Sequence, residues 1–157
     1  MGKLVIESAP TRHGTGYPEP YDQPCLSRKR WRLGNAAGLT QFGVNLLRLP
    51  ADAWSSQRHW HATEDEFVYV LEGEVVLVTN NGEAILRTGD CAGFKAGDPD
   101  SHHLQNRSKK EAVILEIGSR NPNGDGVDYP DIDLAIRAGS AGYIHKDGKP
   151  YPPKPRR

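Results

Sequence analysis

The amino-acid sequence predicts an all-β fold, either a barrel or a sandwich, and three observations support this prediction. Short runs rich in β-branched and aromatic residues recur along residues 42–117. Glycine, asparagine and proline separate these runs, and their backbone preferences favour turns. No segment combines helix-capping residues with a helical spacing of apolar side chains. Together these features are typical of short strands joined by tight connections.

Six strands are predicted from these runs. The first ends before Pro50 and the second is stopped by Gly73. The third and fourth meet across Asn81-Gly82, a dipeptide that tolerates positive φ and therefore predicts a type I′ hairpin. The predicted strands are residues 42–49, 66–72, 74–80, 83–87, 91–94 and 112–117.

Composition narrows the classes of partner. The 157 residues carry 20 Lys and Arg against 20 Asp and Glu, so no net charge attracts nucleic acid or an anionic membrane. The apolar run Leu4-Val5-Ile6 is too short for a signal peptide or a membrane span, which predicts a cytoplasmic protein. Cys25 and Cys91 match no disulfide or zinc spacing and are expected to be reduced thiols. A small-molecule ligand is therefore the expected partner.

The triplet His59-Trp60-His61 carries the strongest chemical signal. Side chains alternate along a strand, so His59 and His61 point to the same interior. Glu66 opens the next predicted strand, where its carboxylate can lie beside the histidines across an antiparallel pair. Two imidazoles and a carboxylate suit one divalent ion such as Fe, Mn, Ni or Zn, and His102 would add a third imidazole.

These residues resemble the cupin superfamily, whose first motif is G-x5-H-x-H-x(3 or 4)-E-x6-G. The chain matches it from Ala53 through His59, His61 and Glu66 to Gly73, with alanine in place of the leading glycine. The family's second motif, G-x5-P-x-G-x2-H-x3-N, resembles Gly89 to Asn106. Here Lys95 replaces the proline, and four residues rather than two separate Gly97 from the histidine, so the loop must bulge.

This departure makes His102 and His103 competitors for the last ligand position. The spacing to Asn106 selects His102, and neighbouring residues on a strand face opposite ways. His103 is then expected at the pocket rim or on the surface.

The resemblance implies a double-stranded β-helix, or jelly roll, with a metal ion inside its mouth, in a protein that is often dimeric. We therefore expect residues 1–157 to form a single cupin domain and, in the cell, a homodimer. Its parts would be an N-terminal arm with edge strands (1–39), a core barrel (about 40–118) and a C-terminal extension (119–157). The surrounding order of elements is similar to small bacterial cupins, some of which carry sugar phosphate isomerase labels.

Three functions fit these expectations. The first is a metal-dependent enzyme acting on a small polar metabolite, either an oxygenase or an isomerase. The second is a non-catalytic module that binds or senses a small molecule. The third is a structural or storage barrel without stoichiometric metal. We favour the first.

Other motifs are given ordinary structural roles. Asn121, Asn123, Asp125 and Gly126 occupy calcium-loop positions one, three, five and six, but Ile132 replaces the bidentate glutamate, so a turn-rich connector is expected. The basic segment Ser27–Arg32 could grip phosphate or a base, although a solvated strand edge is favoured. Four further polar residues are candidates for the pocket lining: Arg48, Gln57, Tyr69 and Gln105.

Overall fold

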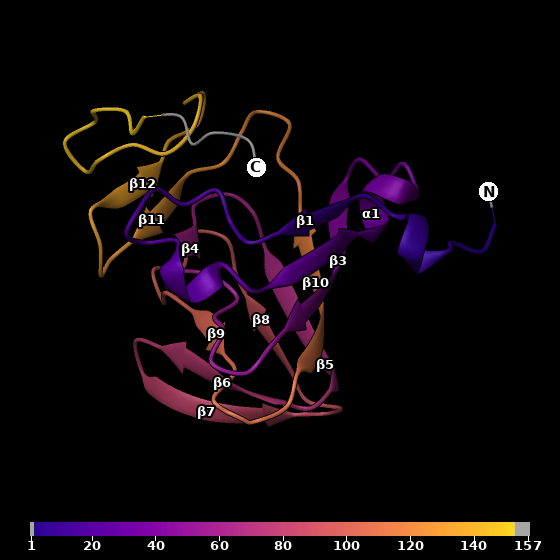
Figure 1. Ribbon diagram of the computed structural model, residues 1–157. Helices are drawn as coiled ribbons and strands as arrows, with labels where there is room; N and C mark the ends of the chain where they lie inside the picture. Colours follow the sequence, from indigo (N-terminus) through magenta and orange to yellow (C-terminus); the bar gives the residue numbers. More distant parts are fainter. Residues whose placement is uncertain (1, 153–157) are drawn as a thin grey trace.

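Strands arranged in three sheets make up most of the regular structure of residues 2–152, which are the residues that the computed structural model describes (Figure 1). In chain order they are β1 (Thr11–His13), β2 (Lys29–Arg32), β3 (Phe42–Leu49), β4 (Trp60–His61), β5 (Glu66–Glu72), β6 (Glu74–Thr79), β7 (Gly82–Arg87), β8 (Cys91–Phe94), β9 (His103–Gln105), β10 (Ala112–Ser119), β11 (Val127–Tyr129) and β12 (Leu134–Ile136). The predicted all-β fold of jelly-roll type is confirmed.

The helices of the described chain are short. They are two 3-10 helices, η1 (Ile6–Ser8) and η2 (Gln23–Cys25), and one α-helix, α1 (Leu33–Ala36). None of the helices within residues 2–152 is long and apolar enough to cross a bilayer.

The barrel core lies between a large and a small sheet. The large sheet has the order β1-β2-β3-β10-β5-β8, and the small sheet has the order β7-β6-β9. Alternate residues of the central strands point inward, so Leu47 and Leu49 on β3 and Val70 on β5 are fully buried. They pack with Val75 of the small sheet and Leu104 of β9. Burial of these side chains provides the main hydrophobic stabilisation of the barrel.

The predicted hairpin forms, but its turn is not the predicted one. Thr79 pairs with Gly82, so the two loop residues are Asn80 and Asn81 rather than Asn81 and Gly82. Neither asparagine has a positive φ, which a type I′ turn requires at both positions. Asp100 accepts hydrogen bonds from the Asn80 backbone N–H at 2.8 Å and from Asn81 Nδ2 at 3.3 Å. A tertiary contact therefore selects the turn in place of local preference.

Both ends of the chain contribute short strands. Residues 8–24 are mostly irregular, but β1 lies within them and pairs with β2. In the C-terminal extension, β11 pairs with β12 and with β4, which forms a third sheet of order β12-β11-β4. A second buried cluster joins the two ends through Tyr17 and Cys25 on one side and Tyr129 and Leu134 on the other. The proline-rich and basic composition of residues 150–157 predicts an extended or disordered segment. The structure describes this segment only to residue 152, and its remainder lies outside the described residues.

Candidate metal centre

The candidate ligands come from separate sheets. His61 lies on β4, which pairs with β11, and His59 precedes β4 and forms an isolated bridge with His102. Glu66 begins β5 in the large sheet, where β5 pairs with β8 and β10. The expectation that Glu66 reaches the histidines across an antiparallel pair is therefore wrong. Residues 62–65 carry the chain from one sheet to the other, and the side chains meet between the sheets.

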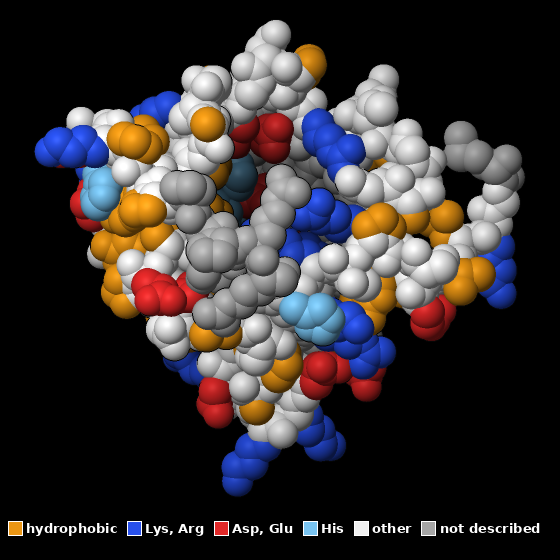
Figure 2. All heavy atoms as spheres, turned by 45° about the horizontal axis from the view of Figure 1, so that its top comes forward, with side chains coloured by type: hydrophobic (Ala, Val, Ile, Leu, Met, Phe, Trp, Pro, Cys, Tyr) orange, Lys and Arg blue, Asp and Glu red, His pale blue; other side chains and the backbone are white. Residues whose placement is uncertain are grey.

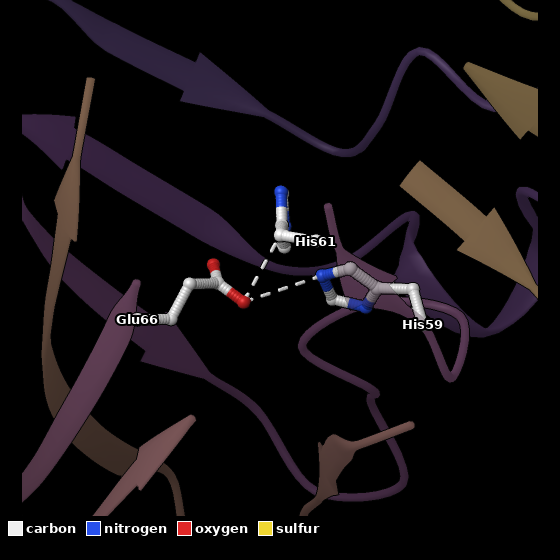
Figure 3. A group of neighbouring side chains, drawn as sticks. All are labelled: His59, His61 and Glu66. Atoms are coloured by element: carbon white, nitrogen blue, oxygen red, sulfur yellow. Dashed lines mark ion pairs between the residues drawn. The ribbon is translucent and has the colours of Figure 1, made fainter. Parts of the chain in front are cut away.

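The four candidate side chains converge on one carboxylate oxygen. Glu66 Oε2 lies 3.5 Å from His59 Nε2, 3.4 Å from His61 Nε2 and 2.9 Å from His102 Nε2. Figure 3 shows the imidazoles of His59 and His61 facing the carboxylate of Glu66. The ligand atoms of His59, His61 and Glu66 all lie within 4.8 Å of one another, while His102 joins this group through Glu66.

Hydrogen bonds set the orientation of two of the imidazoles. His59 Nδ1 lies 2.9 Å from the carbonyl oxygen of Gln57, which can only accept, so Nδ1 carries the proton. His61 Nδ1 donates in the same way to the carboxylate of Asp125. In each ring the Nε2 atom, which faces Glu66, is left unprotonated, so its lone pair is available to bind a metal ion. Such partners fix the tautomer of a metal-binding histidine.

His102 is held by packing rather than by a hydrogen bond at Nδ1. Its ring stacks on Phe94 with the centroids 3.4 Å apart and the planes 3° from parallel. Its buried Nδ1 has no hydrogen-bond partner within the described part of the chain. Phe94 therefore restricts the ring plane, while Nε2 contacts Glu66.

His103 points away from this centre. Its Nδ1 donates to the carbonyl oxygen of Ser56 at 2.9 Å, and its Nε2 accepts from Gln105 Nε2 at 3.0 Å. The ring lies edge-on to Trp54 and is 4% exposed, so His103 is a buried cavity-wall residue rather than a surface one. Burial lowers the pKa of His103 to about 4. Of the two neighbours, His102 is the one beside Glu66.

The charge state of the centre suits a cation. Burial opposes ionisation of Glu66, but the hydrogen bond from His102 and the nearby imidazoles of His59 and His61 hold its pKa well below the usual value. Burial also lowers the pKa of His102, although the contact with Glu66 raises it. At neutral pH the centre therefore combines a carboxylate with a neutral His102 ring, and these are the forms that bind metal. The donor types and their spacing fit one divalent ion such as Fe, Mn, Ni or Zn.

A cavity of about 460 Å³ opens beside the centre and includes His59, Glu66 and His102 in its wall. A second cavity of about 150 Å³ also borders the centre and has His61, Glu66 and His102 in its wall. Figure 2 shows a hollowed surface in which acidic and histidine side chains are visible, with Lys and Arg side chains gathered beside it. The first volume falls in the range of small-molecule sites.

The predicted pocket residues do not line either cavity. Arg48 and Tyr69 are exposed, whereas Gln57 is buried and donates through Nε2 to the carbonyl oxygen of Tyr21 at 2.6 Å. Gln105 is occupied with His103. Their position near strand ends does not determine which way each side chain faces.

The structure differs from the sequence prediction at two features of the site. Asp125 lies in the predicted turn-rich connector, but its carboxylate contacts His61. The sequence predicts a solvated edge for the basic segment, but Arg28, Arg30 and Arg32 line the larger cavity. The spacing of these arginines at every second residue was the available signal, because it places them on one face of a strand. Nothing local to Asp125 indicates its partner 64 residues away.

Comparison with known proteins adds the family. The cupin domain family matches residues 45–118. A crystal structure of a sugar phosphate isomerase from the cupin superfamily of Silicibacter pomeroyi is 42% identical, with a TM-score of 0.88 over 96% of this chain and 97% of that chain. Among curated proteins, none matches the chain.

More distant structures share the fold. A provisionally named sugar phosphate isomerase from Acidithiobacillus ferrooxidans is 29% identical, with a TM-score of 0.70 over 82% of each chain. The polyketide cyclase RemF from Streptomyces resistomycificus is 17% identical, with a TM-score of 0.59 over 78% of this chain and 82% of that chain. At that identity the likeness concerns the fold alone.

Proposed function

Because the chain belongs to the cupin superfamily, we propose that it is a metal-dependent enzyme acting on a small polar metabolite. One divalent ion, Fe, Mn, Ni or Zn, is held by His59, His61, Glu66 and His102. The observation that carries the proposal is the approach of three imidazole Nε2 atoms to within 3.5 Å of Glu66 Oε2. The names of the relatives from Silicibacter pomeroyi and Acidithiobacillus ferrooxidans favour sugar-isomerase-like chemistry over dioxygenase-like chemistry.

The residues of the centre have two kinds of role, binding the ion and orienting the rings that bind it. The imidazoles bind as neutral donors, and Glu66 binds as a carboxylate that supplies negative charge. Asp125 and the Gln57 carbonyl orient two of the rings, and Phe94 restricts the third. A bound divalent ion would act as a Lewis acid toward a carbonyl or hydroxyl oxygen of the ligand.

Metal analysis tests whether the chain binds a divalent ion through these ligands. Protein purified without chelator is expected to hold one divalent ion per chain, and the double variant His59→Ala/His61→Ala is expected to lose it. The matched control is His13→Ala/His145→Ala, which removes two histidines that line neither cavity and should leave the metal content unchanged. Equal metal content in the wild type and the His59→Ala/His61→Ala variant would overturn the assignment.

Turnover assays test whether the metal-loaded protein is an enzyme. The metal-loaded wild type is expected to interconvert aldose and ketose forms of a sugar phosphate, and the His59→Ala/His61→Ala variant is expected to be inactive. Stoichiometric metal without turnover on sugar phosphate, oxygenase and keto acid panels would instead support the binding or sensing module.

The same proposal covers the domain organisation, the oligomeric state and the cellular location of the protein. Residues 1–157 form one folding unit, the unit assembles as a homodimer, and the dimer works in the cytoplasm on a small-molecule ligand. A single unfolding transition, light scattering and cell fractionation test these statements in turn. Two separate transitions, a monomer mass or a secreted protein would contradict them.

A further inference from the structure

Four arginines lie on one face of two neighbouring strands at the edge of the large sheet. Arg28, Arg30 and Arg32 are two residues apart at and before β2, and Arg12 on β1 is the register partner of Arg30. All four line the 460 Å³ cavity that also contains His59 and Glu66. We call these four residues the arginine face. Figure 2 shows Lys and Arg side chains gathered at one side of the hollow.

The arginine face and Glu66 of the candidate metal centre lie on the same face of the large sheet. Arg32 pairs with Asn45 on β3, and Gly43, two residues earlier on β3, lies on the same face. Gly43 pairs with Gly118, which in turn pairs with Glu66. Two glycines therefore lie between the arginine side and Glu66, and no side chain rises from these positions. The guanidinium of Arg120, which also lines the cavity, lies 3.6 Å from the point where a Cβ of Gly43 would stand, so this part of the cavity floor carries a further arginine.

The positive charge of the arginine face is only partly compensated. Arg30 forms a bidentate ion pair with Glu116, with contacts of 2.6 and 2.7 Å. Arg28 is 5% exposed and donates from Nε to the carbonyl oxygen of Gly14 at 3.1 Å. Within the described residues, no carboxylate lies at ion-pair distance from Arg28 or Arg32.

This arrangement is costly without a ligand. Burial lowers the pKa of Arg28, and the neighbouring charge of Arg30 lowers it further. A buried cation without a counter-charge destabilises a folded protein, and an anion placed beside it relieves that cost. The other cavity carboxylates are engaged elsewhere, because Glu64 accepts a hydrogen bond from the Asn121 backbone N–H and Glu66 faces the histidines.

We propose that the arginine face is a phosphate-binding subsite, so that the cavity takes a small phosphate monoester. The phosphate lies against Arg28 and Arg32, and the opposite, hydroxylated end of the molecule faces Glu66 and the three histidines. Several guanidinium groups offer more N–H donors than the two oxygens of a carboxylate can accept, and a phosphate dianion has three terminal oxygens. The assignment rests on the proposed function, because it takes the same cavity as the substrate site.

The experiment measures binding of four probes to metal-free full-length protein by calorimetry or NMR titration. The probes are inorganic phosphate, ribose 5-phosphate, ribose and succinate. The wild type is expected to bind ribose 5-phosphate at least about tenfold more tightly than ribose. Arg32→Gln and Arg28→Gln are each expected to weaken binding of both phosphate probes by about tenfold or more. Arg48→Gln is the matched control, because Arg48 is an exposed arginine outside the cavity, and it should change binding less than about twofold.

Each alternative outcome is decisive. Equal binding of ribose and ribose 5-phosphate, or an equal loss in Arg48→Gln, overturns the subsite. Preference for succinate over both phosphate probes overturns it in favour of a carboxylate site. Thermal melts check that the variants fold. If Arg28→Gln does not fold, Arg32→Gln still tests the subsite, because Arg32 is only half-buried. Because the titrations contain no metal, failure here leaves the metal analysis intact. Equal metal content in the wild type and the His59→Ala/His61→Ala variant, with phosphate binding retained, would count only against the proposed function.

Discussion

Asp125 and His61 are joined by a hydrogen bond in which His61 Nδ1 donates to Asp125 Oδ2. The carboxylate of Asp125 also accepts from the backbone N–H of Thr63 at 2.8 Å and from its hydroxyl at 2.9 Å. The two side chains are 10% and 17% exposed, so water competes little with this contact. The C-terminal extension thereby orients a ring of the candidate metal centre.

Removing Asp125 should weaken metal binding without removing a ligand. In Asp125→Ala the His61 ring loses the partner that sets its tautomer, so we expect the metal affinity to fall by about 10- to 100-fold. Competition with a chromophoric chelator measures this. Asp128→Ala is the control, because Asp128 pairs with Arg137. An affinity unchanged in Asp125→Ala would refute the orienting role.

Gly73 should tolerate no side chain. Its φ is +81°, and a Cβ there would lie 3.1 Å from both Ala112 Cα and the carbonyl oxygen of Glu111. Gly73→Ala is expected to lower the free energy of unfolding by about 1–3 kcal/mol, measured by urea denaturation. Gly142→Ala has open space and no positive φ, so it should change stability by less than about 0.5 kcal/mol. Equal effects of the two substitutions would contradict this explanation.

The Arg30–Glu116 ion pair should show strong coupling. The two side chains are 20% and 18% exposed, so removing one leaves the other charge largely without water. Arg30→Met is expected to destabilise the protein by on the order of 3 kcal/mol, and Arg30→Met/Glu116→Leu by less. Urea denaturation of both single variants and the double variant completes the cycle. Additive losses would mean that the pair contributes no coupling.

The two cysteines should differ in reactivity. Cys25 is fully buried, and burial raises its pKa to about 11, so its reactive thiolate is scarce at neutral pH. Cys91 is exposed. Maleimide at pH 7 is expected to label one thiol per native chain and two after unfolding, as counted by mass spectrometry. Native Cys91→Ser should remain unlabelled, and rapid labelling of that variant would show that Cys25 is accessible.

Much of the barrel was predictable because strand signals are local. The predicted bounds of β3, β5 and β8 agree with the structure, since proline, glycine and β-branched residues act on the backbone near them. The short strands β1, β9 and β12 were not predicted. Each has three residues; β1 and β9 are held by pairing with β2 and β6, and β12 by a hairpin with β11, rather than by a sequence pattern of its own.

By itself the sequence determined that His59 and His61 share a face, that Glu66 starts a strand, and that the barrel is all-β. Each of these follows from backbone geometry over a few residues. Only the tertiary structure decided that Asp125 contacts His61 and that the arginines of residues 28–32 face a cavity. The physical reason is that a strand's alternation defines two faces, whereas packing against other sheets determines which face is inside.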